Sequence, residues 1–203
     1  MASQIQKSLP DYVKSNNEEG LNFLRLGGTD VYFPLSEEDK NDIEILEEKY
    51  DSEENCAGIA APQIGIQKKV IIFAAEDKGD LKKWRSDLTQ TMPKTIWINP
   101  SYEPVGEEKY KDYEACFSVP DIAAAVWRYK KIYYKAYDVE GNLIEGEAEG
   151  FLARIMQHEI DHVYGKLFTD YAEESEIFSI SEYREKRKAS LEAGVDKQHQ
   201  DEL

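Results

Sequence analysis

The sequence predicts an α+β fold in which antiparallel β-sheets pack around a central helix, with further helices near the N-terminus and the C-terminus. Two observations lead to this prediction. Short apolar runs separated by turn residues fill the middle of the chain and are typical of strands. A segment with helical periodicity, 151–162, follows these runs, and strands grouped ahead of a helix are typical of α+β proteins.

The N-terminal part of the chain is predicted to hold a polar arm, an apolar segment and a helix. Residues 1–20 are polar, and we expect them to form a loosely held arm. The apolar segment 21–26 ends at two glycines, which mark a turn. Ser36 and Asp39 resemble a capping box that uses Asp, so a helix is expected to begin after Ser36. Its buried edge is expected to consist of Ile43, Leu46 and Tyr50.

The middle of the chain is predicted to form strands, which are separated by turns and by one charged insertion. The insertion, 76–93, is expected to be a surface elaboration with a short helix around 81–88. A hairpin turn is predicted at 140–142, because Gly and Asn favour tight turns between strands. The strands are expected at 70–73, 95–99, 124–126, 132–137 and 143–148.

The C-terminal part of the chain is highly charged, and a helix is expected there at 181–193 before a frayed end. A chain of 203 residues with 41% hydrophobic residues can bury one core without a second domain. We therefore expect one catalytic domain at 21–171. The arm at 1–20 precedes it, and a charged C-terminal helix and tail at 172–203 follow it.

The chain is strongly acidic, with a formal net charge of −16. This charge repels phosphate backbones and anionic lipids, which excludes binding to nucleic acid through bulk electrostatics. Residues 1–20 lack the basic start and apolar run of a secretory signal, and no segment is long enough to span a bilayer. We therefore expect a cytoplasmic protein without sequence-specific nucleic-acid partners or membrane partners. In that compartment Cys56 and Cys116 are expected to be free thiols or ligands.

The central helix carries His158, Glu159 and His162 in a His-Glu-x-x-His pattern. Positions four apart on a helix lie within about 40° of each other, so both imidazoles can coordinate one ion. Glu159 lies about 100° round from His158, where it can hydrogen-bond a metal-bound water without coordinating the metal. The pattern therefore predicts two histidine ligands and a glutamate general base.

The orientation of this helix follows from its apolar residues, which share one stripe with the histidines. The stripe consists of Phe151, Ile155, His158 and His162. The histidines are therefore expected to face inward. A more polar side is expected to consist of Arg154, Gln157 and Asp161. Gly165 stands where a left-handed cap would end the helix.

A catalytic metal of this type needs a third protein ligand. A third histidine six residues after His162 would define one class of metalloprotease, but Phe168 occupies that position. Glu182 lies where a thermolysin-like site would take its glutamate ligand. Cys116 could coordinate as a thiolate. From the residues alone, Glu182 and Cys116 both remain open.

Cys116 lies in the second of three short blocks, 56–63, 114–118 and 157–162. The first block resembles the Gly-x-Gly-x-Ala-Ala-x-Gln block of the peptide deformylase family, and the second resembles its Glu-Gly-Cys-Leu-Ser block. The His-Glu-x-x-His segment is the third. The order and spacing of the blocks are also similar, and the resemblance covers roughly residues 20–171.

The resemblance implies removal of the formyl group from the N-terminal formyl-methionine of newly made proteins, with release of formate. It implies a metal held by Cys116, His158 and His162, with Fe(II) in the cell. A thiolate and two imidazoles also accommodate Zn(II), Ni(II) or Co(II), any of which the purified protein could hold. The expected partners are formyl-Met nascent peptides near the ribosome, and the expected state is a monomer.

The resemblance also implies roles for residues around the metal. The Gln63 side-chain amide and the Phe117 backbone N–H would donate hydrogen bonds to the oxyanion. Gly58 would bind the substrate backbone at close range. Phe151 and Ile155 are our expectation for the walls of the methionine pocket.

Two other functions remain open. The chain has Ala115 and Phe117 where the family has Gly and Leu, and Cys56 where it has Gly. A positive φ at Ala115 would cost about 1 kcal/mol or more, so a homologue that binds N-terminal peptides without turnover is the first alternative. A thermolysin-like zinc endopeptidase that uses Glu182 is the second. The roles of Glu114 and Arg128 also stay open, either as supports of the metal ligands or as a surface ion pair.

Overall fold

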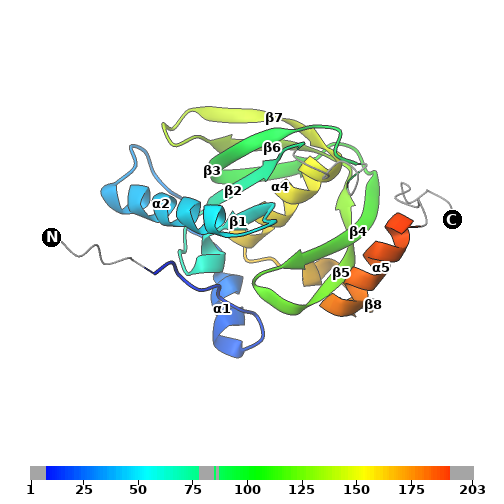
Figure 1. Ribbon diagram of the computed structural model, residues 1–203. Coiled ribbons are helices and arrows are strands. Elements are labelled where there is room, and N and C mark those ends of the chain that lie inside the picture. Colours follow the sequence, from blue (N-terminus) through cyan, green and yellow to red (C-terminus); the bar gives the residue numbers. More distant parts are fainter. Residues whose placement is uncertain (1–7, 78–84, 86, 193–203) are drawn as a thin grey trace.

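The computed structural model describes residues 8–77, 85 and 87–192, and it has an α+β fold, as the sequence predicts. Two antiparallel sheets lie on either side of a central helix (Figure 1). The first sheet has five strands in the order β1-β2-β3-β6-β7, and the second has three in the order β4-β5-β8. The described residues contain no helix that is both long enough and apolar enough to cross a membrane.

The bounds of the elements follow. The five-stranded sheet consists of β1 (Gly58–Ala60), β2 (Val70–Ala75), β3 (Met92–Pro104), β6 (Lys131–Tyr137) and β7 (Leu143–Glu149). The three-stranded sheet consists of β4 (Lys109–Cys116), β5 (Val119–Tyr129) and β8 (Ala172–Ser179). The helices are α1 (Glu18–Leu26), α2 (Glu37–Ser52), α4 (Gly150–Val163) and α5 (Ile180–Glu192), with short 3₁₀ helices η1 (Ala61–Ile64) and η2 (Phe168–Tyr171).

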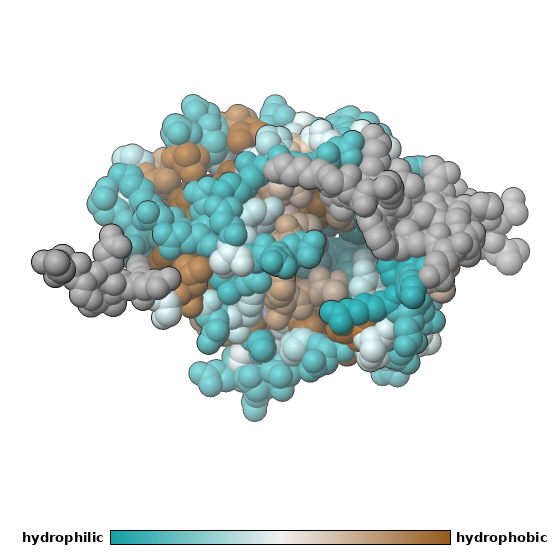
Figure 2. Space-filling view, in the orientation of Figure 1, coloured by the Kyte–Doolittle hydropathy of each residue, from teal (hydrophilic) through white to brown (hydrophobic). Residues whose placement is uncertain are grey.

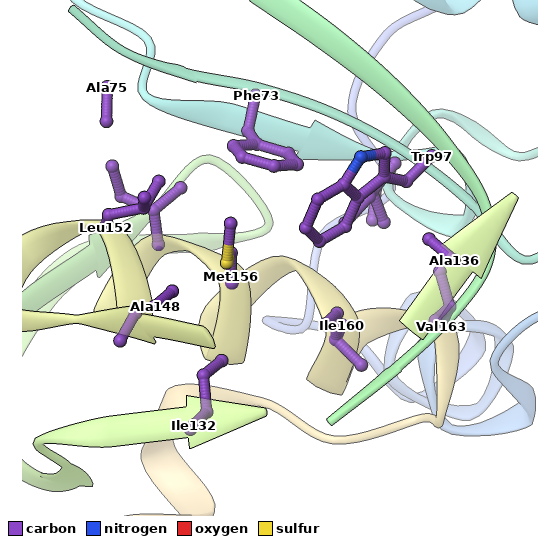
Figure 3. Packing of buried hydrophobic residues seen from close by; sticks show 14 of the residues in the cluster. Phe73, Ala75, Trp97, Ile132, Ala136, Ala148, Leu152, Met156, Ile160 and Val163 are labelled. Carbon is purple, nitrogen blue, oxygen red and sulfur yellow. The ribbon is translucent and has the colours of Figure 1, made fainter. Parts of the chain in front are cut away.

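The main core lies between the five-stranded sheet and α4. Phe73 and Trp97 from the sheet face Met156 and Ile160 from the helix, and at most 1% of any of these residues is exposed (Figure 3). The Phe73 and Trp97 rings meet edge to face with centroids 4.7 Å apart. Burial of side chains of this size contributes about 1.5–3 kcal/mol each to stability. The packing of these sheet residues on Met156 and Ile160 therefore holds α4 against the sheet.

Several local predictions are confirmed. Ser36 and Asp39 form the expected capping box at the start of α2. All five predicted strands lie within observed strands, and the 140–142 turn joins β6 to β7, with Gly141 at a φ of +86°. Gly165 has a φ of +71° just after α4, as a left-handed cap requires. The helix predicted at 181–193 corresponds to α5, whereas most of 81–88 lies outside the described residues.

The polar side expected on α4 is not exposed. Arg154, Gln157 and Asp161 are each at most 3% exposed, because the three-stranded sheet covers this side of the helix. The Gln157 side chain exchanges two hydrogen bonds with the backbone of Tyr129 in β5, at 3.0 and 2.9 Å. Helical periodicity alone could not reveal this second layer, since these polar groups are buried with their partners.

The two ends of the chain also differ from expectation. The arm expected to be loosely held over 1–20 is docked in its described part, because the Val13 and Ser15 N–H groups donate hydrogen bonds to the body of the protein. The expected end of the arm, residue 20, falls inside α1, whose N-cap is Asn17. At the other end, the charged segment after residue 171 begins with β8, a strand of the smaller sheet.

Candidate metal centre

Three potential ligands from two elements meet beside α4. Cys116 ends β4, and His158 and His162 lie one turn apart on α4. One ligand atom from each lies within 4.8 Å of the others. The Cys116 Sγ atom is 3.3 Å from His162 Nε2, and the two histidine Nε2 atoms are 3.3 Å apart.

These spacings fit a tetrahedral metal. Two nitrogen atoms bound at 2.0–2.1 Å to one tetrahedral ion lie about 3.3–3.4 Å apart, which matches the observed separation of the imidazoles. The donor set of one thiolate and two imidazoles suits Fe(II), Zn(II), Co(II) or Ni(II). The residues present therefore fit a metal ion with three protein ligands.

A buried carboxylate orients one of the histidines. Glu114 Oε2 lies 2.8 Å from His158 Nδ1, and Arg128 and Arg154 donate further hydrogen bonds to the same carboxylate at 2.7–2.9 Å. Burial opposes ionisation of Glu114, but Arg128 outweighs it and holds the Glu114 pKa well below its ordinary value. An ionised Glu114 keeps the proton on His158 Nδ1, which leaves Nε2 available to a metal.

The Glu114–Arg128 pair is therefore an internal ion pair and not a surface one. Glu114 is 7% exposed and Arg128 is 2% exposed. Arg128 also binds Asp161 on α4, so one guanidinium joins β4 to the central helix. The ion pair anchors the wall that carries Cys116 to the helix that carries both histidines.

Glu159 lies in a tightly packed position next to the potential ligands. The residue is 4% exposed, and its Oε2 atom has no hydrogen-bond partner. A Cβ atom at Gly58 would come within 2.6–2.7 Å of the Glu159 side chain, so glycine is required there. Burial raises the pKa of Glu159 to about 7. A carboxyl group of this kind can take up and return a proton near neutral pH.

The Gln63 side chain is fixed beside Cys116. Its Oε1 atom accepts a hydrogen bond from the Ala60 N–H at 2.7 Å, which leaves the amide NH₂ group facing the ligands. Gln63 Nε2 lies 3.2 Å from Cys116 Sγ. The side chain is 2% exposed, so the donor is held in one orientation.

A cleft of about 660 Å³ opens over this group of residues. Eight of the nine site residues expected from the sequence line it, and His162 lies behind them. The eight are Gly58, Gln63, Cys116, Phe117, Phe151, Ile155, His158 and Glu159. The face that Figure 2 views exposes apolar residues flanked by hydrophilic ones.

Other residues of the cleft were not expected. Arg85 comes from the charged insertion, and its guanidinium carbon lies 3.9 Å from the centre of the Phe151 ring. Tyr183 and Arg187 come from α5. Sequence patterns gave no signal for these residues, because both segments are mostly charged and resemble exposed surface.

The other candidate ligand has a different position. Glu182 is exposed, and its carboxylate accepts hydrogen bonds from the Ser179 N–H and hydroxyl at 2.8 and 2.7 Å. It therefore caps the start of α5. In the part of the chain that the structure describes, Cys116 and not Glu182 joins the two histidines. Cys56 and Cys116 form no disulfide.

Comparison with known proteins agrees with this geometry. The family model described as "Polypeptide deformylase" matches residues 21–177, which include every residue of the centre. The chain belongs to the peptide deformylase family. This confirms the resemblance that the sequence blocks carry.

Deformylases from several bacteria are similar to the chain. Peptide deformylase 2 of Rickettsia conorii is 55% identical over 196 residues, covering 95% of this chain and 97% of the relative. Peptide deformylase 2 of Ralstonia nicotianae is 37% identical over 140 residues, covering 68% and 76%. A Met-Ala-Ser-bound class I type b deformylase from Acinetobacter baumannii superposes with a TM-score of 0.69 at 28% identity, covering 81% of this chain and 98% of that chain.

Peptide deformylases are metal-dependent enzymes that remove the formyl group from N-terminal methionine. The chain is accordingly a hydrolase of this class. The comparisons support the deformylase interpretation over the two alternatives, an endopeptidase and an inactive homologue.

Proposed function

We propose that the chain deformylates formyl-Met peptides with Cys116, His158 and His162 as metal ligands and Glu159 as general base. The observation that carries this proposal is the convergence of three ligand atoms within 4.8 Å beside an unpaired, buried carboxylate. We assign Fe(II) as the metal in the cell, with Zn(II), Ni(II) or Co(II) as substitutes in the purified protein.

The residues of the cleft have separate roles in the proposed reaction. A metal held by Cys116, His158 and His162 would supply the Lewis acidity that polarises the formyl oxygen and makes water a better nucleophile. Glu159 accepts a proton from the attacking water and returns it to the amine as the C–N bond breaks, which releases formate. The Gln63 amide and the Phe117 N–H donate hydrogen bonds to the oxygen of the attacked carbonyl.

The substrate-binding residues complete the assignment. Gly58, which lines the cleft beside Glu159, receives the substrate backbone. Phe151 and Ile155 form walls of the methionine pocket, since both line the cleft and neighbour the histidines on α4. We propose that the protein acts as a cytoplasmic monomer on nascent chains near the ribosome.

The departures from the family blocks do not argue against turnover. Among the described residues, the non-glycine positions with positive φ are Asn55, Asn99 and Asp121, so Ala115 carries no left-handed strain. The ring of Phe117 stacks on a neighbouring aromatic side chain, and Phe117 lines the cleft.

The first prediction tests the ligand assignment. Anaerobically prepared protein loaded with Fe(II) or Ni(II) is expected to release formate from formyl-Met-Ala-Ser. Cys116→Ala should lose both metal and formate release, because a thiolate ligand is missing. Glu182→Ala should keep both, since Glu182 only caps α5. Full metal content and activity in Cys116→Ala would overturn the assignment.

A further inference from the structure

We propose that residues 12–15 of the N-terminal arm are positioning residues that hold the two oxyanion donors in place. The inference rests on the proposed function, which gives Gln63 and Phe117 that role. Residues 12–15 themselves contribute no group to the cleft. It acts through the two segments that carry the donors.

The arm is hydrogen-bonded to both of these segments. The Val13 N–H donates to the Gln63 carbonyl at 2.8 Å, and the Ser15 N–H donates to the Ser118 carbonyl at 2.8 Å. Gln63 belongs to η1, next to the five-stranded sheet, whereas Ser118 follows Phe117 in the turn between β4 and β5. Two bonds from one short stretch of backbone therefore join the two walls of the cleft.

A ring stack adds a side-chain link to the second wall. The Tyr12 and Phe117 rings are nearly parallel, at 13°, with centroids 4.7 Å apart. Lys49 of α2 lies 4.4 Å from the centre of the Tyr12 ring. Phe117 is 40% exposed, and the Tyr12 ring covers part of the side chain of this residue, whose N–H is the proposed donor.

The position of the arm is fixed at its other end. A Cβ atom at Gly20 would lie 2.0 Å from the Lys14 carbonyl oxygen, so the arm packs directly on the first turn of α1. Val13 packs with the buried cluster that contains Leu24 and Val119. The arm is thus held between α1 and the cleft, and its backbone donors have a defined direction.

This arrangement matters for the reaction because oxyanion donors act only at short range. A donor that is displaced by about 1 Å loses much of its effect on the transition state, while binding of the ground state changes little. Loosening of the arm is therefore expected to lower kcat and to leave KM and metal content nearly unchanged.

The test compares three tyrosine variants. Tyr12→Ala is expected to lower kcat about tenfold with KM within about twofold of wild type and full metal content. Tyr12→Phe should keep the wild-type kcat, because the ring alone makes the stack. Tyr32→Ala, which removes a tyrosine that is 79% exposed, is the control and should behave as wild type. An unchanged kcat in Tyr12→Ala would overturn the inference.

A second measurement does not depend on turnover. Hydrogen exchange of the peptides that cover 61–64 and 116–119 is expected to be faster in Tyr12→Ala than in wild type, and unchanged in Tyr32→Ala. In a Phe117→Leu background, Tyr12→Ala should cause little further loss of kcat, because the two rings act as a pair. Unchanged exchange in Tyr12→Ala would refute the positioning role, whereas wild-type protein without formate release would refute the proposed function.

Discussion

The carboxylate of Glu114 links the buried ion pairs of the protein to the proposed metal ligand His158. It accepts hydrogen bonds from Arg128, Arg154 and His158 inside the protein, so its negative charge is matched by two arginines. Removing one member of a buried ion pair leaves an uncompensated charge, which is much more costly than the loss of a surface pair.

Glu114→Gln is expected to weaken metal binding by about 10–100-fold and to lower stability by about 3 kcal/mol. The amide keeps the volume but cannot neutralise the arginines or fix the His158 proton. Chelator competition measures the first effect, and urea unfolding measures the second.

Glu108→Gln is the matched control. Glu108 pairs with Lys130 at the surface, where both side chains are more than half exposed, and it should change neither quantity. Equal metal affinity in Glu114→Gln and wild type would contradict the role assigned to Glu114.

At this scale the sequence indicated the three residues that meet in the structure better than it indicated their surroundings. His158, Glu159 and His162 are recognisable because a helix turns four-residue spacing into a shared direction. The partners of Glu114 lie 14 to 44 residues away, and only the tertiary fold decides whether they are buried or exposed. For this reason the sequence left the ion pair undecided.

At the scale of elements, α5 and β8 have separate roles although they are adjacent in sequence. β8 pairs with β5 and completes the smaller sheet, while Tyr183 and Arg187 of α5 line the cleft. β8 was missed because its acidic and apolar residues do not alternate, and the segment is charged overall.

Truncation after Ser179 is expected to leave metal binding intact and to raise KM for formyl-Met tripeptides severalfold, because one wall of the cleft is lost. Truncation after Asp170 also removes β8 and should lower the unfolding midpoint sharply, since β5 loses a partner strand. Measurements of metal content, KM and thermal unfolding distinguish the effects of the two truncations. An unchanged KM after removal of α5 would show that this wall does not contact substrate.

At the scale of the whole molecule, Arg25 and Asp170 connect the first helix to the segment after α4. Two hydrogen bonds of 2.5 and 2.6 Å join them, and Asp170 also accepts from the Leu167 N–H. Burial raises the Asp170 pKa, but the Arg25 hydrogen bond outweighs it, and the pKa lies below the ordinary value of 3.8. The ionised form is therefore favoured in the folded state.

The resulting stability has a defined pH dependence. A lowered folded-state pKa stabilises the protein above the ordinary value of 3.8, and the effect is lost as pH falls through the lower folded value. Asp170→Asn is expected to cost about 1 kcal/mol at pH 7, since both side chains are about one third exposed. Urea unfolding should show this difference shrinking below pH 4, and a constant difference would contradict the assignment.

The α+β class and the positions of five strands could be predicted because apolar periodicity is local. The division into two sheets could not, since it depends on pairings such as β5 with β8, in which Ile122 lies opposite Ser179. The docked arm was also beyond sequence patterns, because its contacts are made largely by backbone groups that every residue has.

The pairing of β8 with β5 has a consequence for how the protein is made. All three proposed metal ligands have been synthesised once residue 162 is added, but the strand that pairs with β5 ends only at Ser179. During translation, β5 therefore has an unpaired edge while the ligands are already present. An open edge of this kind can pair with other chains, so aggregation of the nascent chain is favoured in the interval before β8 emerges.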